Sequence, residues 1–247
     1  MEHKKEKHVS ERSSQSFFGD PWKVFLSLVV VILLAYIALN SKPPQTNRGD
    51  NQNGSNQSAT QARATIELFV MSQCPYGVQA ETLAKSVIDS FNGEVNLSVR
   101  FIASENADGS FTSLHGANEV AEDLRQVCIM KYYPAKIMNY TGCIAANYSN
   151  AGSIWQNCAG SNSIDSTKIS NCSTGNEGKA LLSENIKLGE SLGIGSSPTM
   201  MLNNNTLFST IYAEQINEVV CAYDPALNGC NKTLSGAGTT TPSGGCG

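Results

Sequence analysis

Hydrophobic residues change their spacing several times along this chain, and each spacing predicts a different element. Residues 24–39 form an apolar run, VFLSLVVVILLAYIAL, with no charged side chain. With Trp22 and Asn40 as flanks, the run approaches the roughly 20 residues that a helix needs to cross about 30 Å of hydrocarbon. A helix in a protein core would carry a polar face, and this run has none. We therefore predict a single transmembrane helix over residues 22–40.

The charges on either side of this run indicate its orientation. Basic residues are concentrated before it, at Lys4, Lys5, Lys7, Arg12 and Lys23, whereas only Lys42 and Arg48 follow nearby. The positive-inside tendency keeps the basic side in the cytoplasm. We expect residues 1–21 to be a cytoplasmic tail and the chain after residue 40 to lie outside the cell membrane. A cleaved signal peptide is the alternative, although the leading segment is long for one and no A-x-A site follows the run.

Composition divides the rest of the chain into a central domain and two flanking segments. Residues 41–63 are rich in Asn, Gln, Ser and Gly, as expected of a flexible linker. Residues 234–247, which include Cys246, have the composition of a disordered tail. Residues 64–233 lie between them and are numerous enough for one well-buried core.

The central domain opens with the pattern strand, helix, strand. Residues 65–71 are rich in β-forming side chains and end at a turn. Between residues 76 and 91, apolar side chains recur at three- and four-residue steps, which predicts an amphipathic helix that stops at Asn92–Gly93. Residues 95–101 alternate between apolar and polar, as in a half-buried strand. Two parallel strands joined by a crossover helix, and hence an α/β fold, follow from this order.

A second group of elements follows Pro198. Residues 200–202 form a short apolar run that ends at a turn over residues 203–205. Leu207 and Phe208 then predict a returning strand. Apolar residues between 216 and 220 predict a final helix.

Cysteine usage agrees with export from the cytoplasm. All eight cysteines follow the apolar run, and none has the close spacing of a zinc-ligand pair. We therefore expect disulfides in an oxidising compartment, and no metal or other cofactor. Eight Asn-x-Ser/Thr acceptor sites add mild support for a surface location. The acidic character of the exported part argues against a nucleic-acid partner.

The sharpest chemical signal lies at the junction of the first strand and the helix, in the sequence S-Q-C-P-Y-G over residues 72–77. A cysteine just before a helix has its sulfur near free backbone N–H groups and the positive end of the helix dipole, and both stabilise the thiolate. Pro75 suits the first helical position because its missing N–H costs nothing there. We expect Cys74 to be an exposed, reactive cysteine. The alternative is a buried structural cysteine in an inactive fold.

These residues carry a family resemblance. The chain resembles thioredoxin-fold oxidoreductases of the DsbA-like group, and within it the lysosomal thiol reductase (GILT) family. C-P-Y-G at residues 74–77 stands where that family has a Cys-x-x-Cys pair. The spacing of the family's H-G-x-x-E segment and of its later cysteines is kept over about residues 66–230, at His115, Gly116, Glu119, Cys128, Trp155, Cys158 and Cys172.

The resemblance implies a thioredoxin-like fold with a helical insertion between the second strand and Pro198. It also implies that Pro198, followed by Thr199, is the cis-proline that faces the active cysteine. Tyr76 is then expected to pack in the core or to line the substrate groove. His115 is a candidate for tuning the thiolate, with a helix-capping or packing role as the simpler interpretation.

Three positions depart from the family pattern. Gly77 replaces the second cysteine of the active pair, and Ser113 and Val120 stand where the family has further cysteines. Two-cysteine turnover within the motif is therefore impossible. Cys74 can still form a mixed disulfide, which another group must then release.

The remaining cysteines suggest what that group is. Six of them are expected to form structural disulfides, and nearest-neighbour pairing is one hypothesis among the many connectivities that six cysteines allow: Cys128 with Cys143, Cys158 with Cys172, and Cys221 with Cys230. Cys74 and Cys246 are left over. Cys246 is therefore a candidate resolving cysteine, and an incidental or intermolecular cysteine is the alternative.

Together these patterns predict a membrane-anchored, extracytoplasmic thiol–disulfide oxidoreductase. Its partners would be exported cysteine-containing proteins and a membrane or small-molecule thiol redox partner. Reductase or isomerase activity is easier to reconcile with Gly77 than oxidation is, but oxidation returns if Cys74 and Cys246 pair. Two other classes are a catalytically inactive binding or chaperone module and an iron–sulfur carrier like the monothiol glutaredoxins. The carrier would need a reducing compartment.

Overall fold

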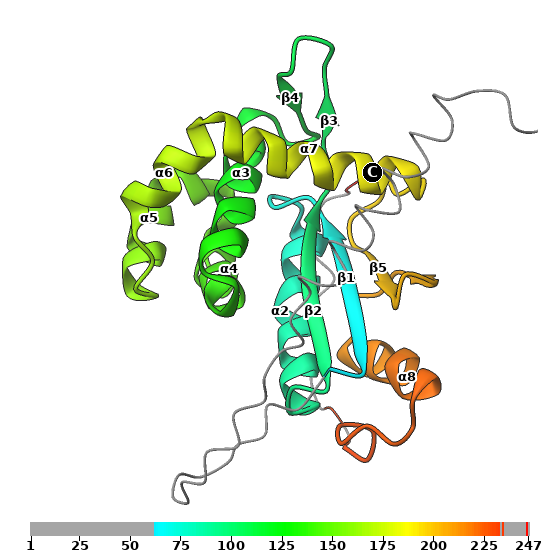
Figure 1. Ribbon diagram of the computed structural model, residues 1–247. Coiled ribbons are helices and arrows are strands. Elements are labelled where there is room, and N and C mark those ends of the chain that lie inside the picture. The colour runs from blue at the N-terminus through cyan, green and yellow to red at the C-terminus, as the bar shows by residue number, and fades with distance from the viewer. Residues whose placement is uncertain (1–61, 233, 235–245, 247) are drawn as a thin grey trace, which may run out of the picture. The chain divides into compact units, whose positions relative to one another are not determined.

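The computed structural model of this chain describes residues 62–232, Leu234 and Cys246 (Figure 1). The predicted cytoplasmic tail, the predicted transmembrane helix over residues 22–40 and nearly all of the predicted linker lie outside these residues. Over the described part of the chain, no helix is long and apolar enough to cross a membrane. The first strand begins at Ala64, where the sequence predicts the domain to begin.

A mixed sheet with the strand order β2-β1-β5-β6 forms the centre of the domain. β1 (Ala64–Val70) pairs in parallel with β2 (Val95–Phe101), which confirms the predicted strand–helix–strand unit. β5 (Thr199–Leu202) runs antiparallel to β1, and β6 (Thr206–Phe208) returns beside β5. β1 is buried along nearly its whole length, as a central strand covered on both faces must be.

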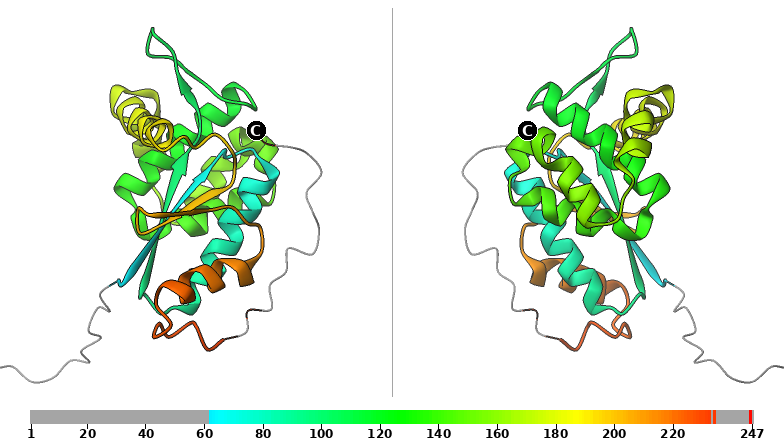
Figure 2. Two further views of the ribbon diagram at one scale, coloured as in Figure 1. Left: turned by 90° about the vertical axis from the view of Figure 1, so that its right-hand side faces the viewer. Right: turned by 90° about the vertical axis from the view of Figure 1, so that its left-hand side faces the viewer.

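Helices cover both faces of this sheet (Figure 2). α2 (Pro75–Ser90) and α8 (Ala213–Tyr223) lie together on one face, and α7 (Asn176–Ser191) lies on the other. α2 turns its predicted apolar stripe toward the sheet. The chain leaves it through Asn92 and Gly93, whose φ angles of 53° and 86° suit these two residue types.

A helical insertion separates β2 from α7, as the resemblance implies. It lies beside the sheet in Figure 1. A small hairpin of β3 (Ser104–Glu105) and β4 (Phe111–Thr112) precedes it. Two short 3-10 turns, Pro134–Lys136 and Tyr148–Asn150, connect its helices. The helices are α3 (Ala117–Tyr132), α4 (Ile137–Ala145), α5 (Ala151–Ser161) and α6 (Ser166–Thr174).

Two disulfides staple the insertion, and their pairing differs from the expected one. Cys128 pairs with Cys172, and Cys143 pairs with Cys158. Nearest-neighbour pairing is therefore wrong for these four cysteines. The physical reason is helix packing: α3 lies against α6, and α4 lies against α5, so each disulfide joins the two helices that touch.

The last helix is stapled as well. The disulfide between Cys221 and Cys230, which the sequence predicts, ties α8 to the turn that follows it. That turn packs closely against the end of α2. A Cβ atom at Gly229 would lie 2.5 Å from the ring of Phe91, which is fully buried.

Alkylation of single-cysteine variants tests the pairing in the insertion. In Cys128→Ser we expect one new free thiol, located on Cys172 by alkylation of the unreduced protein and peptide mass spectrometry. In the matched variant Cys143→Ser the label is expected on Cys158. Loss of the longer loop should lower the free energy of unfolding by about 4 kcal/mol. A label on Cys143 in the first variant would contradict this connectivity.

Candidate active site

Cys74 lies at the start of α2, where the sequence places it. It is the N-cap residue, with an extended backbone at φ −73° and ψ 123°, and its sulfur accepts the Gly77 N–H over 3.3 Å. Pro75 occupies the first turn, where an N–H would have no partner within the helix. A negative charge on the Cys74 sulfur would therefore be stabilised by a direct donor and by the helix dipole.

The loop before β5 faces the same sulfur. The peptide bond between Ser197 and Pro198 is cis, as the resemblance implies. The Ser197 carbonyl oxygen lies 3.7 Å from the Cys74 sulfur. Thr199 donates its hydroxyl to the Ser196 carbonyl over 2.7 Å and so closes the loop. The expected opposition of the active cysteine and the cis-proline loop is present.

Gly77, which replaces the second cysteine of the family motif, is tightly enclosed. A Cβ atom built on it would lie 2.6 Å from the Ser197 hydroxyl oxygen and 2.9 Å from the Met71 carbonyl oxygen. The Ser197 hydroxyl is held in that place because it accepts the Met71 N–H over 2.9 Å. The cis-proline loop therefore fills the space that a second cysteine would need.

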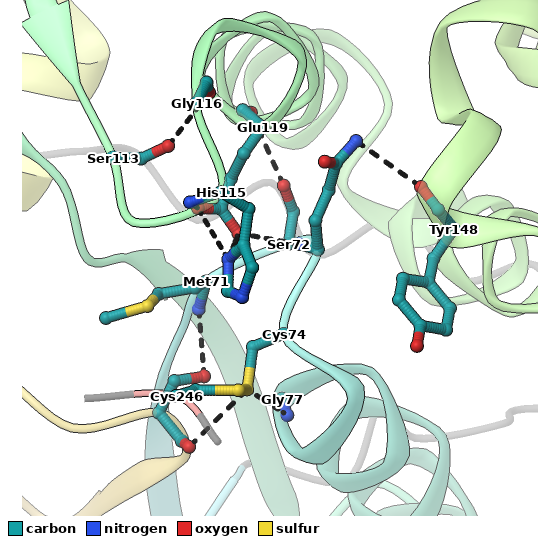
Figure 3. Close-up of polar contacts among 12 residues, drawn as sticks. Met71, Ser72, Cys74, Gly77, Ser113, His115, Gly116, Glu119, Tyr148 and Cys246 are labelled. Atoms are coloured by element: carbon teal, nitrogen blue, oxygen red, sulfur yellow. Dashed lines mark hydrogen bonds and ion pairs between the residues drawn. A yellow bond between two sulfur atoms is a disulfide. The ribbon is translucent and has the colours of Figure 1, made fainter. Parts of the chain in front are cut away.

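The helical insertion holds the turn that leads into Cys74. Glu119 of α3 is fully buried and accepts the Gln73 N–H through Oε1 over 2.8 Å. The Ser72 hydroxyl donates to the Glu119 carbonyl, and the Gln73 side-chain amide donates to the Tyr148 carbonyl, each over 3.4 Å. These contacts fix the backbone immediately before the cysteine (Figure 3).

His115 joins the site as a partner of Glu119. Its Nδ1 lies 2.9 Å from Oε1 and 3.0 Å from Oε2 of that carboxylate, and its backbone N–H donates to Oε2 over 3.2 Å. One carboxylate thus bonds both the active-site turn and the imidazole. That His115 tunes the Cys74 thiolate stays a prediction.

Three further carboxyl groups are buried in helices α2 and α3. Glu81 of α2 is 4% exposed, and Glu122 and Asp123 of α3 have no exposed surface. Burial raises the pKa of Glu81 to about 8, and the charge of Glu122 adds to that effect. Burial also raises the pKa of Glu122, although Arg125 opposes the shift, and it raises the pKa of Asp123 well above its ordinary value. At neutral pH the folded protein therefore favours the protonated form of Glu81.

Cys74 and Cys246 form a disulfide that joins positions 172 residues apart in the sequence, with their Cα atoms 5.8 Å apart (Figure 3). Met71 packs on the pair, together with the partly buried Tyr76 and Ile102. Cys74 is 0% exposed and Cys246 is 8% exposed. The expectation of an exposed Cys74 is therefore wrong for this state, because the bonded cysteine and its apolar neighbours cover the sulfur.

An open hollow of about 370 Å³ lies next to the cis-proline loop. Tyr76 and Pro198 line one part of it, and Thr210, Tyr212 and Gln215 line another. Tyr76 thus lines a surface recess and also packs on the disulfide, and that this recess is the substrate groove stays a prediction. Tyr212 is 43% exposed and offers an aromatic surface at the rim.

Two of the residues that hold the site carry little signal in the sequence. Ser197 is marked only as the residue before the predicted cis-proline, and nothing local shows that its hydroxyl reaches Met71. Glu119 is expected from sequence as part of a helix start, but the structure makes it the acceptor for Gln73. Its place in the H-G-x-x-E spacing is the one signal that singles it out.

The fold and the site together define a class of protein. A cysteine at the N-terminus of the first helix, opposite a cis-proline loop, is the arrangement of thioredoxin-fold thiol–disulfide oxidoreductases. The model of the family "Gamma interferon inducible lysosomal thiol reductase (GILT)" matches residues 65–162. This match confirms the resemblance to the GILT family over those residues. No curated protein matches the chain significantly.

Solved structures share this fold. The thiol-disulfide exchange protein alpha-DsbA2 from Wolbachia pipientis has a TM-score of 0.51 and 10% identity, with coverage of 83% of this chain and 100% of that one. A thioredoxin-like oxidoreductase from Silicibacter pomeroyi DSS-3 has a TM-score of 0.50 and 16% identity, with 67% and 88% coverage. A periplasmic thioredoxin-like protein from Salmonella enterica serovar Typhimurium has a TM-score of 0.51 and 11% identity, with 66% and 86% coverage. At these identities the likeness establishes the thioredoxin-like fold alone.

The close packing at Gly77 predicts a specific loss of stability. Gly77→Ala places a methyl group in the space held by Ser197 and the Met71 carbonyl, so we expect the free energy of unfolding to fall by about 1–3 kcal/mol in a urea titration. Gly142→Ala is the matched control, because a Cβ on this helical glycine of α4 meets no atom within 4 Å. The control should gain up to about 1 kcal/mol. Equal effects of the two substitutions would contradict the packing argument.

The buried carboxyl groups predict that the domain is more stable in mild acid than at pH 8. Folded Glu81 keeps its proton up to about pH 8, whereas an unfolded glutamate loses it near 4.5. Between these values the folded state binds more protons, so the free energy of unfolding falls as the pH rises. We expect Glu81→Gln to exceed the natural chain in stability at pH 8 by on the order of 2 kcal/mol and to depend less on pH.

The control for this titration is Glu218→Gln, which changes an exposed glutamate of α8. Its pH profile of stability should match that of the natural chain. A Glu81→Gln profile equal to the control would show that Glu81 is ionised in the folded protein.

Proposed function

We propose that this chain is a membrane-anchored thiol–disulfide oxidoreductase that acts on exported proteins through Cys74, with Cys246 as its resolving cysteine. The observation that carries the proposal is the Cys74–Cys246 disulfide at the N-terminus of α2, opposite the cis-proline loop. Gly77 excludes a resolving cysteine within the motif, and Cys246 supplies a thiol from another part of the chain. The description of the matched family as a thiol reductase supports the reductive direction.

The location of the domain is part of the same proposal. The apolar run over residues 22–40 anchors the chain as a single-pass protein of the cell membrane, with the domain on the extracytoplasmic side. The four disulfides among the described residues support an oxidising compartment. The substrates are then exported cysteine-containing proteins, and a membrane protein or a small thiol supplies the electrons.

In the reductive direction, the Cys74 thiolate attacks a substrate disulfide, R–S–S–R′. A bond forms between Cys74 and one substrate sulfur, the substrate S–S bond breaks, and R′–S⁻ leaves and takes up a proton. The Cys246 thiolate then attacks the Cys74 sulfur, which closes the Cys74–Cys246 disulfide and releases R–S⁻. The substrate gains two electrons and the protein loses two, which an external thiol restores.

Two other reactions start from the same site. Isomerisation needs Cys74 alone, because a thiol of the scrambled substrate attacks the mixed disulfide and releases Cys74. Oxidation is the reductive cycle in reverse, and it is available because Cys74 and Cys246 pair.

A non-catalytic binding or chaperone module is the second candidate function. The complete burial of Cys74 favours it, since a covered sulfur suits a structural disulfide. In such a module the disulfide only fastens the chain around Cys246 to the domain. The hollow beside Pro198 would then bind a client protein without any exchange of electrons.

Trapping of mixed disulfides distinguishes the two functions. The protein is reduced, freed of reductant and mixed with a disulfide-bonded reporter peptide, and the products are analysed by mass spectrometry without reduction. Because Cys246→Ser lacks the second nucleophile, we expect it to accumulate the Cys74–peptide adduct at least about tenfold above the natural chain. Cys74→Ser keeps the Cys246 thiol, but we expect that any adduct at Cys246 leads to no reduction of the reporter peptide.

The control for trapping is Ser243→Ala, which changes the sequence near Cys246 and keeps every thiol. It should behave like the natural chain. Reporter reduction that survives in Cys74→Ser would contradict catalysis by Cys74. Absence of any Cys74 adduct in Cys246→Ser would favour the binding module.

A further inference from the structure

The two sulfurs of the Cys74–Cys246 disulfide differ in what surrounds them. Cys74 has no exposed surface, whereas Cys246 keeps 8% of its surface exposed. The Cys74 sulfur also accepts the Gly77 N–H of the helix start over 3.3 Å. It lies 3.7 Å from the Ser197 carbonyl oxygen of the cis-proline loop. An external thiol that reduces this disulfide therefore meets two unequal targets.

The direction of attack makes the difference larger. A thiolate breaks a disulfide by approaching one sulfur along the line of the S–S bond, from the side away from the other sulfur. For Cys74 that side is occupied by the first turn of α2: Figure 3 shows the Gly77 nitrogen on the side of the Cys74 sulfur away from Cys246. Cys246 lies on the other side of the disulfide from the Gly77 nitrogen and keeps 8% of its surface exposed. The geometry therefore favours attack on Cys246.

The stability of the expelled thiolate also favours attack on Cys246. Attack on one sulfur expels the other as a thiolate, and the better-stabilised thiolate leaves faster. A Cys74 thiolate keeps the hydrogen bond from Gly77 and lies at the positive end of the α2 dipole. Attack on Cys246 expels this stabilised thiolate, whereas attack on Cys74 would expel Cys246.

We propose that reducing equivalents enter the oxidised protein at Cys246 and leave the reduced protein at Cys74. This inference rests on the proposed function and assigns the two cysteines to different partners. Cys246 receives electrons from a thiol donor, which is a small thiol or a dithiol. Cys74 passes them to the protein disulfide that is the substrate.

The bonds and electrons of the entry step balance. A donor thiolate, R–S⁻, bonds to the Cys246 sulfur, the Cys74–Cys246 bond breaks, and Cys74 leaves as a thiolate at the start of α2. A second R–S⁻ attacks the donor sulfur of the mixed disulfide, which yields R–S–S–R and a Cys246 thiolate that takes up a proton. The donor loses two electrons, and the protein gains two.

The site of entry is measured on the protein's own disulfide. The oxidised full chain is mixed briefly with glutathione, quenched with acid, labelled on its free thiols with a maleimide, and mapped by peptide mass spectrometry. We expect glutathione on Cys246 and maleimide on Cys74 to exceed the reverse combination at least about tenfold, since both access and leaving group favour it.

The same reaction in urea is the matched control, because the covalent structure is unchanged while the helix and the packing are lost. There the ratio of the two adducts should fall to about one, since the sulfurs become equivalent in access and stabilisation. Glutathione mainly on Cys74 in the folded protein, or an equal ratio in both states, would overturn the inference.

The glutathione labelling and the trapping of mixed disulfides test different claims, so their failures can be told apart. No protein substrate is present, so reversed labelling overturns only the point of entry and leaves catalysis by Cys74 intact. A disulfide that reacts in urea but is inert in the folded protein would overturn the point of entry and would also favour the binding module. If no Cys74–peptide adduct is trapped while glutathione still labels Cys246, the role of Cys74 toward the substrate is overturned.

Discussion

The hydrogen bond from the Met71 N–H to the Ser197 hydroxyl joins the two halves of the site. It connects the end of β1 to the loop that precedes β5, two segments far apart in the sequence. Because the hydroxyl lies 2.6 Å from where a Cβ of residue 77 would be, a side chain at that position would crowd the cis-proline loop. The packing of this turn therefore suits glycine, the residue that replaces the second cysteine of the family motif.

The structural disulfides support the chemistry indirectly. Glu119 and Tyr148 hold the turn before Cys74, and both belong to the helical insertion. The insertion packs mainly through short helices, and a disulfide between α3 and α6 and another between α4 and α5 hold it together. By restricting the unfolded chain, each should contribute on the order of 3–4 kcal/mol. The position of the active-site turn therefore depends on bonds formed well away from it.

The domain combines two uses of buried carboxyl groups. Glu119 is fully satisfied, because it accepts hydrogen bonds from the turn and from His115. Glu81 of α2 lies nearby with one carboxyl oxygen that has no hydrogen-bond partner among the described residues, and burial raises its pKa to about 8. An ionised carboxylate in such a place is costly, so the proton is kept instead. The domain thus couples its stability to pH through a carboxyl group buried in α2.

The sequence by itself determined the local elements of this protein. Hydrophobic periodicity is a local property, so it located β1, α2, β2 and the returning strands, and the S-Q-C-P-Y-G segment placed Cys74 at a helix start. The sequence also offered Cys246 as a candidate partner of Cys74, and the disulfide between them agrees with that hypothesis. Only the tertiary structure decided the burial of Cys74 and the pairing of the cysteines in the insertion. The cost of closing a loop changes by only about 1 kcal/mol between separations of 15 and 44 residues, so sequence distance could not select among pairings. The packing of helices against one another, which no local pattern encodes, made that selection.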